Sequence, residues 1–238
     1  LTTGAVPVQF PIGIEAGFEG VVDLVEMKAL SFEEDSLGQD VVRGEIPAEI
    51  LDECRAARAL LVERAAEQDD ELTEKFLMEE ELSPEEIRRG IRKGTLARAI
   101  TPLFFGSALK NKGVQPLLDG VLHYLPSPAE SGAVTGTHPK TGKPEVRNPD
   151  PEEPLCALAF KTVTDKHGDL TFLRVYSGVL KEKGQLINPR TEKPERINRI
   201  FLMHANDRVQ IPNATAGWIV AVVGLRFTAT GDTLCPKH

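Results

Sequence analysis

The residues best suited to chemistry lie in one short loop between an apolar run and a helical pattern. Leu103–Phe105 is apolar and predicts a short, fully buried strand. Gly106-Ser-Ala-Leu-Lys-Asn-Lys-Gly113 follows, and residues 114–125 then carry apolar side chains at helical spacing. Ligands of such α/β units bind beyond the carboxyl end of the strand, where backbone N–H groups favour an anion or another acceptor atom. Spacing alone also fits an ordinary strand-to-helix connection.

Two motifs that a complete nucleotide site needs do not occur in the sequence. There is no G-x-x-x-x-G-K-[ST] loop, so the cradle for the β- and γ-phosphates is missing. Asn111-Lys112 is followed by Gly113-Val114, so it is not the base-recognition motif N-K-x-D. We therefore expect this chain alone to bind nucleotide weakly or not at all and to be inactive in nucleotide hydrolysis. Because position 1 is Leu, we also expect an excerpt of a longer protein.

Charge is distributed unevenly along the 238 residues. Residues 1–94 hold 10 Lys/Arg and 23 Asp/Glu, which gives a net charge of −13. Residues 95–153 hold 6 of each, and residues 154–238 hold 12 Lys/Arg and 7 Asp/Glu, a net charge of +5. An acidic region favours a basic protein surface, whereas a basic region favours a nucleic-acid backbone. The two ends of the chain therefore predict different partners, although each charge run also fits a solvated face.

Other chemistry receives less support from the sequence. No base, nucleophile and oxyanion donor come together around carboxylates such as Asp23 and Glu26, so a small-molecule enzyme ranks last among the hypotheses. Cys54, Cys156 and Cys235 have no metal-ligand spacing and form no even disulfide set, which indicates buried thiols in a reducing compartment. No apolar run approaches the roughly 20 residues of a membrane helix, and no leader is visible, so we expect no metal and no membrane contact.

The elements before residue 47 read as strands. A proline-broken segment at residues 6–11 predicts an edge strand. Residues 18–24 and 25–32 predict a β-hairpin or one bent strand, residues 33–38 a turn, and residues 41–46 a further strand.

Residues 47–94 read as helices. Pro47 opens a helix that runs to about Gln68, with one apolar face formed by Ile50, Cys54, Leu61 and Ala65. Glu63, Glu67 and Asp70 are spaced i, i+4, i+7 and predict one exposed acidic stripe. A shorter helix follows at residues 71–77.

A third helix begins at Ser83-Pro-Glu-Glu86, with Ser83 as the N-cap residue, and ends at Gly94. Ile87 and Ile91 are its apolar side. Its cations, which could meet RNA but are also ordinary for a last helical turn, are Arg88, Arg89, Arg92 and Lys93.

Residues 127–153 are proline-rich and predict a linker between two domains, at 1–126 and 154–238. Short apolar or alternating segments separated by turn signals follow, which indicates a closed antiparallel β-barrel. The predicted strands are 155–163, 170–177, 185–188, 196–203 and 218–224, and one of the predicted turns is Pro212-Asn213.

At this point the motifs resemble a known family. Gly106-Ser-Ala-Leu-Lys-Asn-Lys-Gly-Val-Gln115 is similar to the last guanine-recognition motif of translational GTPases, in the form found in elongation factor G. Four further segments resemble that family in the same order, and the resemblance covers nearly the whole chain. These segments are Val6-Pro-Val-Gln-Phe-Pro-Ile-Gly13, Tyr124-Leu-Pro-Ser-Pro128, Phe172-Leu-Arg-Val-Tyr-Ser-Gly178 and Thr230-Gly-Asp-Thr-Leu234.

The resemblance implies a fold and a binding partner for each part of the chain. The fold is the end of a GTPase domain with an α+β insert subdomain, followed by the all-β second domain. The Ser107, Ala108 and Leu109 backbone would contact guanine, and the missing motifs would lie upstream of Leu1. Glu63, Glu67 and Asp70 would contact the ribosomal stalk protein. The barrel would rest on small-subunit ribosomal RNA, and the basic residues to test for this contact are Arg174, Lys193, Arg196 and Arg199.

The full-length parent would be a cytoplasmic, ribosome-dependent GTPase that uses GTP/GDP with Mg to promote translocation of tRNA and mRNA. Asp165-Lys-His-Gly168 is shorter than the family's usual loop and leaves a ribosome-recycling paralogue open. A hypothesis of another class is a non-enzymatic adaptor, with an acidic protein-docking lobe and an RNA-binding barrel.

Overall fold

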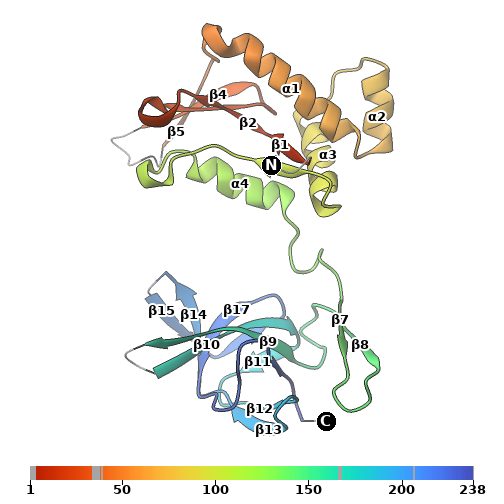
Figure 1. Ribbon diagram of the computed structural model, residues 1–238, viewed down its shortest axis with the longest axis vertical. Coiled ribbons are helices and arrows are strands. Elements are labelled where there is room, and N and C mark those ends of the chain that lie inside the picture. The colour runs from red at the N-terminus through yellow and green to blue at the C-terminus, as the bar shows by residue number, and fades with distance from the viewer. Residues whose placement is uncertain (1–3, 34–37, 39, 166–167, 206, 238) are drawn as a thin grey trace. The chain divides into compact units, whose positions relative to one another are not determined.

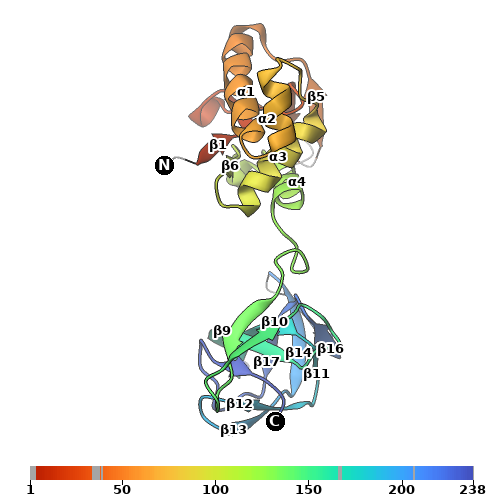
Figure 2. The same ribbon diagram turned by 90° about the vertical axis from the view of Figure 1, so that its right-hand side faces the viewer.

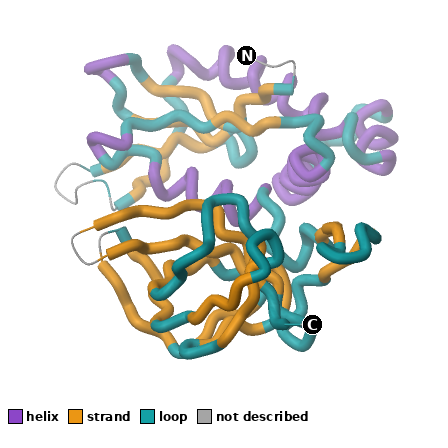
Figure 3. Tube along the Cα trace, turned by 60° about the horizontal axis from the view of Figure 1, so that its bottom comes forward, coloured by secondary structure: helices purple, strands orange, loops and turns teal. Residues whose placement is uncertain are grey.

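The computed structural model describes residues 4–33, 38, 40–165, 168–205 and 207–237. It divides into two compact units, residues 1–125 and 126–238. Helices and strands both occur in the first unit, whereas the described part of the second consists of strands and connecting segments (Figures 1 and 3). Each unit has a hydrophobic core of its own.

The first unit contains a four-stranded antiparallel sheet in the order β2-β3-β4-β5. The proline-containing strand β2 lies at the edge of this sheet, as the sequence predicts. Asp23 shapes the turn between β3 and β4, because its Oδ1 accepts the N–H groups of Val25 at 2.8 Å and Glu26 at 3.0 Å. The four strands are β2 (Gln9–Ile12), β3 (Gly20–Asp23), β4 (Lys28–Phe32) and β5 (Val41–Gly44). The predicted turn at residues 33–38 falls largely outside the described residues.

Three helices pack beside one another in the first unit (Figure 2). A 3-10 turn, Ala48–Ile50, precedes α1 (Leu51–Ala66), which buries Cys54, Leu61 and Ala65 as predicted. The others are α2 (Asp70–Leu77) and α3 (Pro84–Leu96). Ser83 caps α3 in a full capping box with Glu86, which confirms the predicted helix start.

The predicted end of the third helix is wrong. Gly94 lies inside α3 and is buried, and the helix continues to Leu96. A Cβ at Gly94 would lie 2.8 Å from side-chain atoms of Gln68 and Ile100. Glycine is therefore present here for close packing rather than for helix termination.

A short parallel pair, β1 (Ala5–Pro7) with β6 (Thr101–Leu103), leads into the loop at 106–113 and then α4 (Val114–Tyr124). The predicted burial of Leu103–Phe105 is wrong, because all three residues are only partly buried. Among the described residues β6 pairs with β1 alone, so no strand continues the sheet at its other edge. The apolar side of α4 is likewise exposed, at Leu117, Leu118, Val121, Leu122 and Leu125.

The second unit begins with a hairpin of β7 (Val134–Thr137) and β8 (Pro144–Arg147) and continues as an antiparallel barrel. Six strands form one sheet in the order β15-β14-β17-β10-β9-β18, and backbone bonds between Ile187 and Cys235 join the β12–β13 pair to the end of β18. The all-β barrel that the sequence predicts is confirmed. Its strands are β9 (Cys156–Asp165), β10 (Gly168–Ser177), β11 (Val179–Lys181), β12 (Gln185–Asn188), β13 (Lys193–Arg196), β14 (Arg199–His204), β15 (Asp207–Ile211), β16 (Asn213–Thr215), β17 (Ile219–Val223) and β18 (Thr233–Leu234).

Two details of the predicted barrel need correction. The single strand expected at 196–203 is two strands, because the chain turns at Ile197-Asn198 and bonds there to Gly184 and Val223. The turn expected at Pro212-Asn213 is confirmed at Pro212, where the chain bends after β15, but Asn213 already belongs to β16, which pairs with β11.

Candidate functional site

The loop between β6 and α4 is a closed turn built by backbone bonds. The N–H of Ser107 donates to the carbonyl of Lys112 at 2.8 Å, and the N–H of Lys112 returns a bond to Ser107 at 3.0 Å. Residues Ala108–Lys110 form one 3-10 turn between these two points. Gly113 has a φ of +87°, and a Cβ there would lie 2.7 Å from the Phe105 carbonyl oxygen. Glycine is therefore needed to close the loop.

Ala108 and Leu109 lie at the tip of this loop. The Leu109 side chain is 98% exposed, and Ala108 is also exposed. Within the described residues, neither of their N–H groups has a hydrogen-bond acceptor, whereas the N–H groups of Lys110 and Asn111 bond back into the turn. Two donors are thus presented to solvent side by side, which suits an acceptor atom such as a ring carbonyl oxygen. Two backbone donors can bind an acceptor atom of a base, whereas the β- and γ-phosphates of a nucleotide would need the cradle that the sequence lacks.

The predicted acidic stripe is divided between two helices. Glu63 and Glu67 are exposed on and just after α1, whereas Asp70 is the first residue of α2. The single-helix stripe is therefore wrong for Asp70, because α1 ends at Ala66. Arg64 pairs with Glu67 at 3.0 Å. The Glu63 carboxylate has no ion pair among the described residues, so its charge faces solvent.

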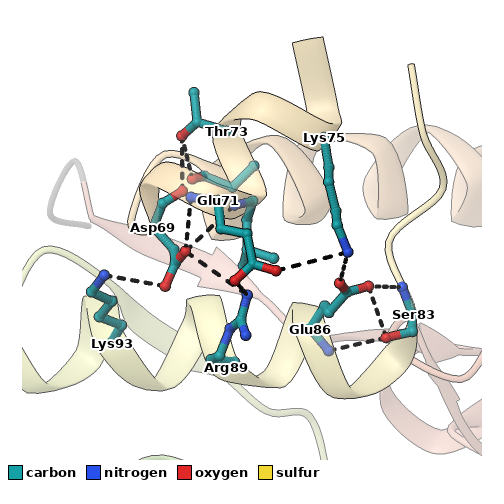
Figure 4. A network of polar contacts seen from close by, with 10 residues as sticks. Asp69, Glu71, Thr73, Lys75, Ser83, Glu86, Arg89 and Lys93 are labelled. Carbon is teal, nitrogen blue, oxygen red and sulfur yellow. Dashed lines mark hydrogen bonds and ion pairs between the residues drawn. The ribbon is translucent and has the colours of Figure 1, made fainter. Parts of the chain in front are cut away.

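The cations of α3 bind partners within the chain, and two of them, Arg89 and Lys93, are shown in Figure 4. Lys93 pairs with Asp69 at 3.1 Å, and Arg89 pairs with Glu71 at 2.9 Å. Arg88 pairs with Glu26, while Arg92 donates to the carbonyl oxygens of His123 and Leu125. The ordinary structural account of this cluster therefore holds.

Glu86 belongs to the same network. The Nζ of Lys75 donates to Glu86 at 2.5 Å, and Ser83 donates to Glu86 through both its N–H and its hydroxyl. The Lys75 bond, with those from Ser83, lowers the pKa of Glu86 to about 2. The Lys93 bond also holds the pKa of Asp69 below its usual value. These carboxylates stay charged and join α2 to α3.

Asp23 and Glu26, the carboxylates considered for catalysis, also have structural partners. Asp23 holds a turn and Glu26 pairs with Arg88. Both line a cavity of about 340 Å³ together with Tyr124, whose pKa burial raises to about 12. Because a tyrosine with this pKa stays protonated at neutral pH, it cannot act as a base, and the structure supplies no catalytic set there.

The four basic residues of the barrel that the resemblance predicts to contact RNA lie on two different sheets. Arg174 on β10 and Arg199 on β14 belong to the six-stranded sheet, where their register partners on β17 are Ile219 and Val223. Lys193 and Arg196 belong to β13, and the Lys193 ammonium lies 4.2 Å from the centre of the Phe227 ring.

Lys161 is a base that sequence reasoning missed. It lies opposite Phe172 in the six-stranded sheet, with its ammonium 5.8 Å from the Phe172 ring. Its strand neighbour Phe160 is 39% exposed. The alternation of β9 could have indicated its outward position, but a bulge between Phe172 and Leu173 shifts the register there.

Two buried carboxylates hold the loop that connects β17 to β18. Glu195 is 3% exposed and accepts the N–H groups of Arg226 at 2.9 Å and Phe227 at 2.7 Å, and the Thr228 hydroxyl at 2.7 Å. Asp232 is 5% exposed and binds Arg190 and Asn188. The Arg190 bonds keep the pKa of Asp232 far below its usual value.

Among the described residues, no group of three or more His, Cys, Asp and Glu side chains is arranged to hold a metal ion. None of the described helices is long and apolar enough to span a membrane.

Comparison with known proteins defines the class of the barrel. Residues 154–237 match the model of the family described as Elongation factor G domain 2. The likeness to this family covers the barrel of the second unit.

A solved structure matches nearly the whole chain. The crystal structure of the protein ttk003000868 from Thermus thermophilus is similar, with a TM-score of 0.75 and 24% sequence identity. The match covers 99% of this chain and 32% of that one, so this chain spans about a third of its length. The fold of this chain therefore recurs within a longer protein of known structure. The family match supports the resemblance to elongation factor G over residues 154–237, and the structural match supports the expected fold over nearly the whole chain.

Proposed function

We propose that this chain is part of a translation factor of the elongation factor G type. The parent protein hydrolyses GTP on the ribosome, in the cytoplasm, and promotes movement of tRNA and mRNA. The observation that carries the proposal is the domain-family match at residues 154–237, in a chain whose fold matches over 99% of its length. This chain supplies one loop of the guanine pocket, an acidic insert and the barrel.

The loop tip is the proposed guanine contact. The N–H groups of Ala108 and Leu109 bind the base, and Ser107 holds the turn through its backbone bonds to Lys112. GTP or GDP with Mg supplies the hydrolysable phosphate chemistry, which the rest of the parent must position. The role of this chain is to orient the base.

Proline at position 108 tests this contact with little change in shape. Residue 108 follows the extended Ser107 and opens the 3-10 turn, a place where proline is tolerated. Ala108→Pro removes one N–H donor. We expect Ala108→Pro to weaken GDP and GTP binding at least tenfold when affinity is measured by calorimetry on the longest reading frame that contains this chain. Leu109→Ala, which keeps its N–H, should change affinity less than twofold. Equal effects of the two variants would refute a backbone contact.

The proposed stalk-protein site consists of Glu63, Glu67 and Asp70. Glu63 and Asp70 have no ion pair among the described residues, so their charges can attract a basic partner surface. Glu63→Lys with Glu67→Lys should abolish chemical-shift changes in an NMR titration with the stalk protein's carboxyl-terminal domain. Glu80→Lys with Glu81→Lys makes the same change of charge at exposed positions outside α1 and should bind normally. Unchanged affinity of the first variant would remove this part of the proposal.

The proposed RNA contacts of the barrel are Arg174, Lys193, Arg196 and Arg199. Lys161 joins them because it lies on the same sheet as Arg174. Aromatic residues make up 5% of the chain, so backbone and shape contacts are favoured over base stacking.

A non-enzymatic adaptor is the second candidate, and the charge asymmetry favours it. An acidic unit and a basic barrel need no nucleotide to bridge a protein and an RNA. Ribosome-stimulated GTP hydrolysis by the parent distinguishes the two: its presence supports the translation factor, and its absence together with salt-sensitive ribosome binding supports the adaptor. A recycling paralogue would hydrolyse GTP but fail in a translocation assay.

A further inference from the structure

Two cysteines that are far apart in the sequence meet across the barrel ladder. Strand β18 pairs with β9 through Thr233↔Leu158 and Leu234↔Ala157. Continuing this antiparallel register by one residue places Cys235 directly opposite Cys156. The third cysteine, Cys54, is buried in the core of the first unit.

The backbone bonds fix the type of this pair. Cys235 donates its N–H to Ile187 at 3.2 Å and accepts the Ile187 N–H at 2.8 Å, so both of its backbone groups face β12. Cys235 and Cys156 are therefore a non-hydrogen-bonded pair, in which the two Cα atoms lie about 4.5 Å apart and side chains approach most closely. That separation is within the range of about 4.4–6.8 Å that a disulfide spans.

Both thiols lie on one face of the sheet. Their neighbours Ala157 and Leu234 are buried in the barrel core, so the alternation of a strand directs Cys156 and Cys235 outward. There they line a cavity of about 460 Å³ that is also lined by the β7–β8 hairpin, including Glu145 and Arg147. Each cysteine is partly exposed. A small reagent thus has room to reach either sulfur.

We propose that Cys156 and Cys235 form a reversible disulfide modification site that is oxidised by a low-molecular-weight disulfide entering this cavity. One thiolate attacks the small disulfide, forms a mixed disulfide and releases one small thiol. The second cysteine attacks the protein sulfur of the mixed disulfide and releases the other small thiol. The protein loses two electrons and two protons, and the small disulfide is reduced to two thiols.

The surroundings set the reactivity of the pair. Burial raises the pKa of both thiols above its ordinary value, and the nearby Arg147 guanidinium opposes this rise in both. Arg147 is held in place by Glu145 at 2.5 Å. The raised pKa leaves little thiolate at neutral pH, so exchange with a small disulfide is slow, and the product joins β9 to β18.

The test is thiol mapping of the intact 238-residue chain after incubation with oxidised glutathione. Remaining thiols are alkylated under denaturing conditions and the peptides are identified by mass spectrometry. We expect alkylation of Cys54 alone, a linked Cys156–Cys235 peptide pair, and recovery of three thiols after reduction. Three unreacted thiols, a link to Cys54, or links only between chains would each overturn the proposal.

Two variants separate the pair from general thiol reactivity. Cys54→Ser should leave the linked pair unchanged. Cys156→Ser should stop at a glutathione adduct on Cys235, because no second thiol can displace it. If that variant does not fold, which Trp218 fluorescence reports, the wild-type map and the Cys54→Ser map decide. The same fluorescence should show a higher unfolding midpoint for the oxidised wild type, lost on reduction.

Discussion

Removing the Glu195 carboxylate should destabilise the barrel without affecting the first unit. Glu195→Ala leaves the buried N–H groups of Arg226 and Phe227 and the Thr228 hydroxyl without their acceptor. Each unsatisfied donor costs about 1–3 kcal/mol, less where water enters the space. We therefore expect a loss of about 3 kcal/mol. For a unit of roughly 110 residues, about 4 °C per kcal/mol gives a fall of about 12 °C in Tm.

The chain offers a probe for each unit. Its one Trp, Trp218, lies in the barrel, so its fluorescence follows barrel unfolding. All the described α-helices lie in the first unit, so ellipticity at about 222 nm chiefly follows that unit. Glu195→Ala should lower the unfolding midpoint that Trp218 fluorescence reports and leave the midpoint that ellipticity reports within about 2 °C of the wild-type value. Glu192→Ala, at an exposed position on the turn before β13, should move neither midpoint. A shift below about 3 °C in the Trp218 signal, or equal shifts in both signals, would refute the reasoning.

Three further predictions test other parts of the structure. Because the folded pKa of Glu86 is depressed, its contribution to stability is complete above the unfolded pKa of about 4.3 and is lost as pH falls toward about 2; Glu86→Gln should therefore flatten the acid dependence of Tm in this window, and an unchanged profile would contradict the network. In a thermal unfolding assay, Gly120→Ala should destabilise the first unit by about 2 kcal/mol, although alanine normally favours helices, because the added Cβ would lie 2.1 Å from the Phe104 ring. The control Gly44→Ala adds a Cβ that meets no atom within 4 Å and should leave stability unchanged. Lys161→Ala should weaken binding of the chain to ribosomal RNA about threefold and reduce its salt dependence, whereas Lys183→Ala on the turn after β11 should not; equal losses in a filter-binding titration would argue against a surface centred on Lys161.

The helices were predictable because their signals are local. The apolar spacing of Cys54, Leu61 and Ala65 defines the buried side of α1, and Ser83 with Glu86 defines the start of α3. The longer barrel strands were predictable for the same reason, since β9, β10 and β17 alternate or are continuously apolar. Strands β15 and β16 were not, because β15 is as long as β17 but largely exposed and β16 has only three residues, so both are strands only through their partners.

Burial and side-chain partners depend on contacts between distant segments, and there local pattern misleads. Leu103–Phe105 is apolar enough for a core strand, but strand β6 ends at Leu103, and only β1 pairs with it among the described residues. Gly94 is typical of a helix end in sequence, yet it lies within α3, where the Ile100 side chain packs against it.

The two cysteines of the barrel show the same limit most clearly. Three scattered cysteines without regular spacing indicate separate buried thiols, and within one strand Cys156 has no reactive neighbour. The opposition of Cys156 and Cys235 depends on the β9–β18 register, which the loop between β17 and β18 helps to fix. That loop is held by Glu195 and Asp232, two buried acids whose partners are backbone and side-chain groups across the barrel. Removing either carboxylate should therefore loosen the cysteine pair as well. Glu195→Ala should slow formation of the Cys156–Cys235 link while leaving each thiol present.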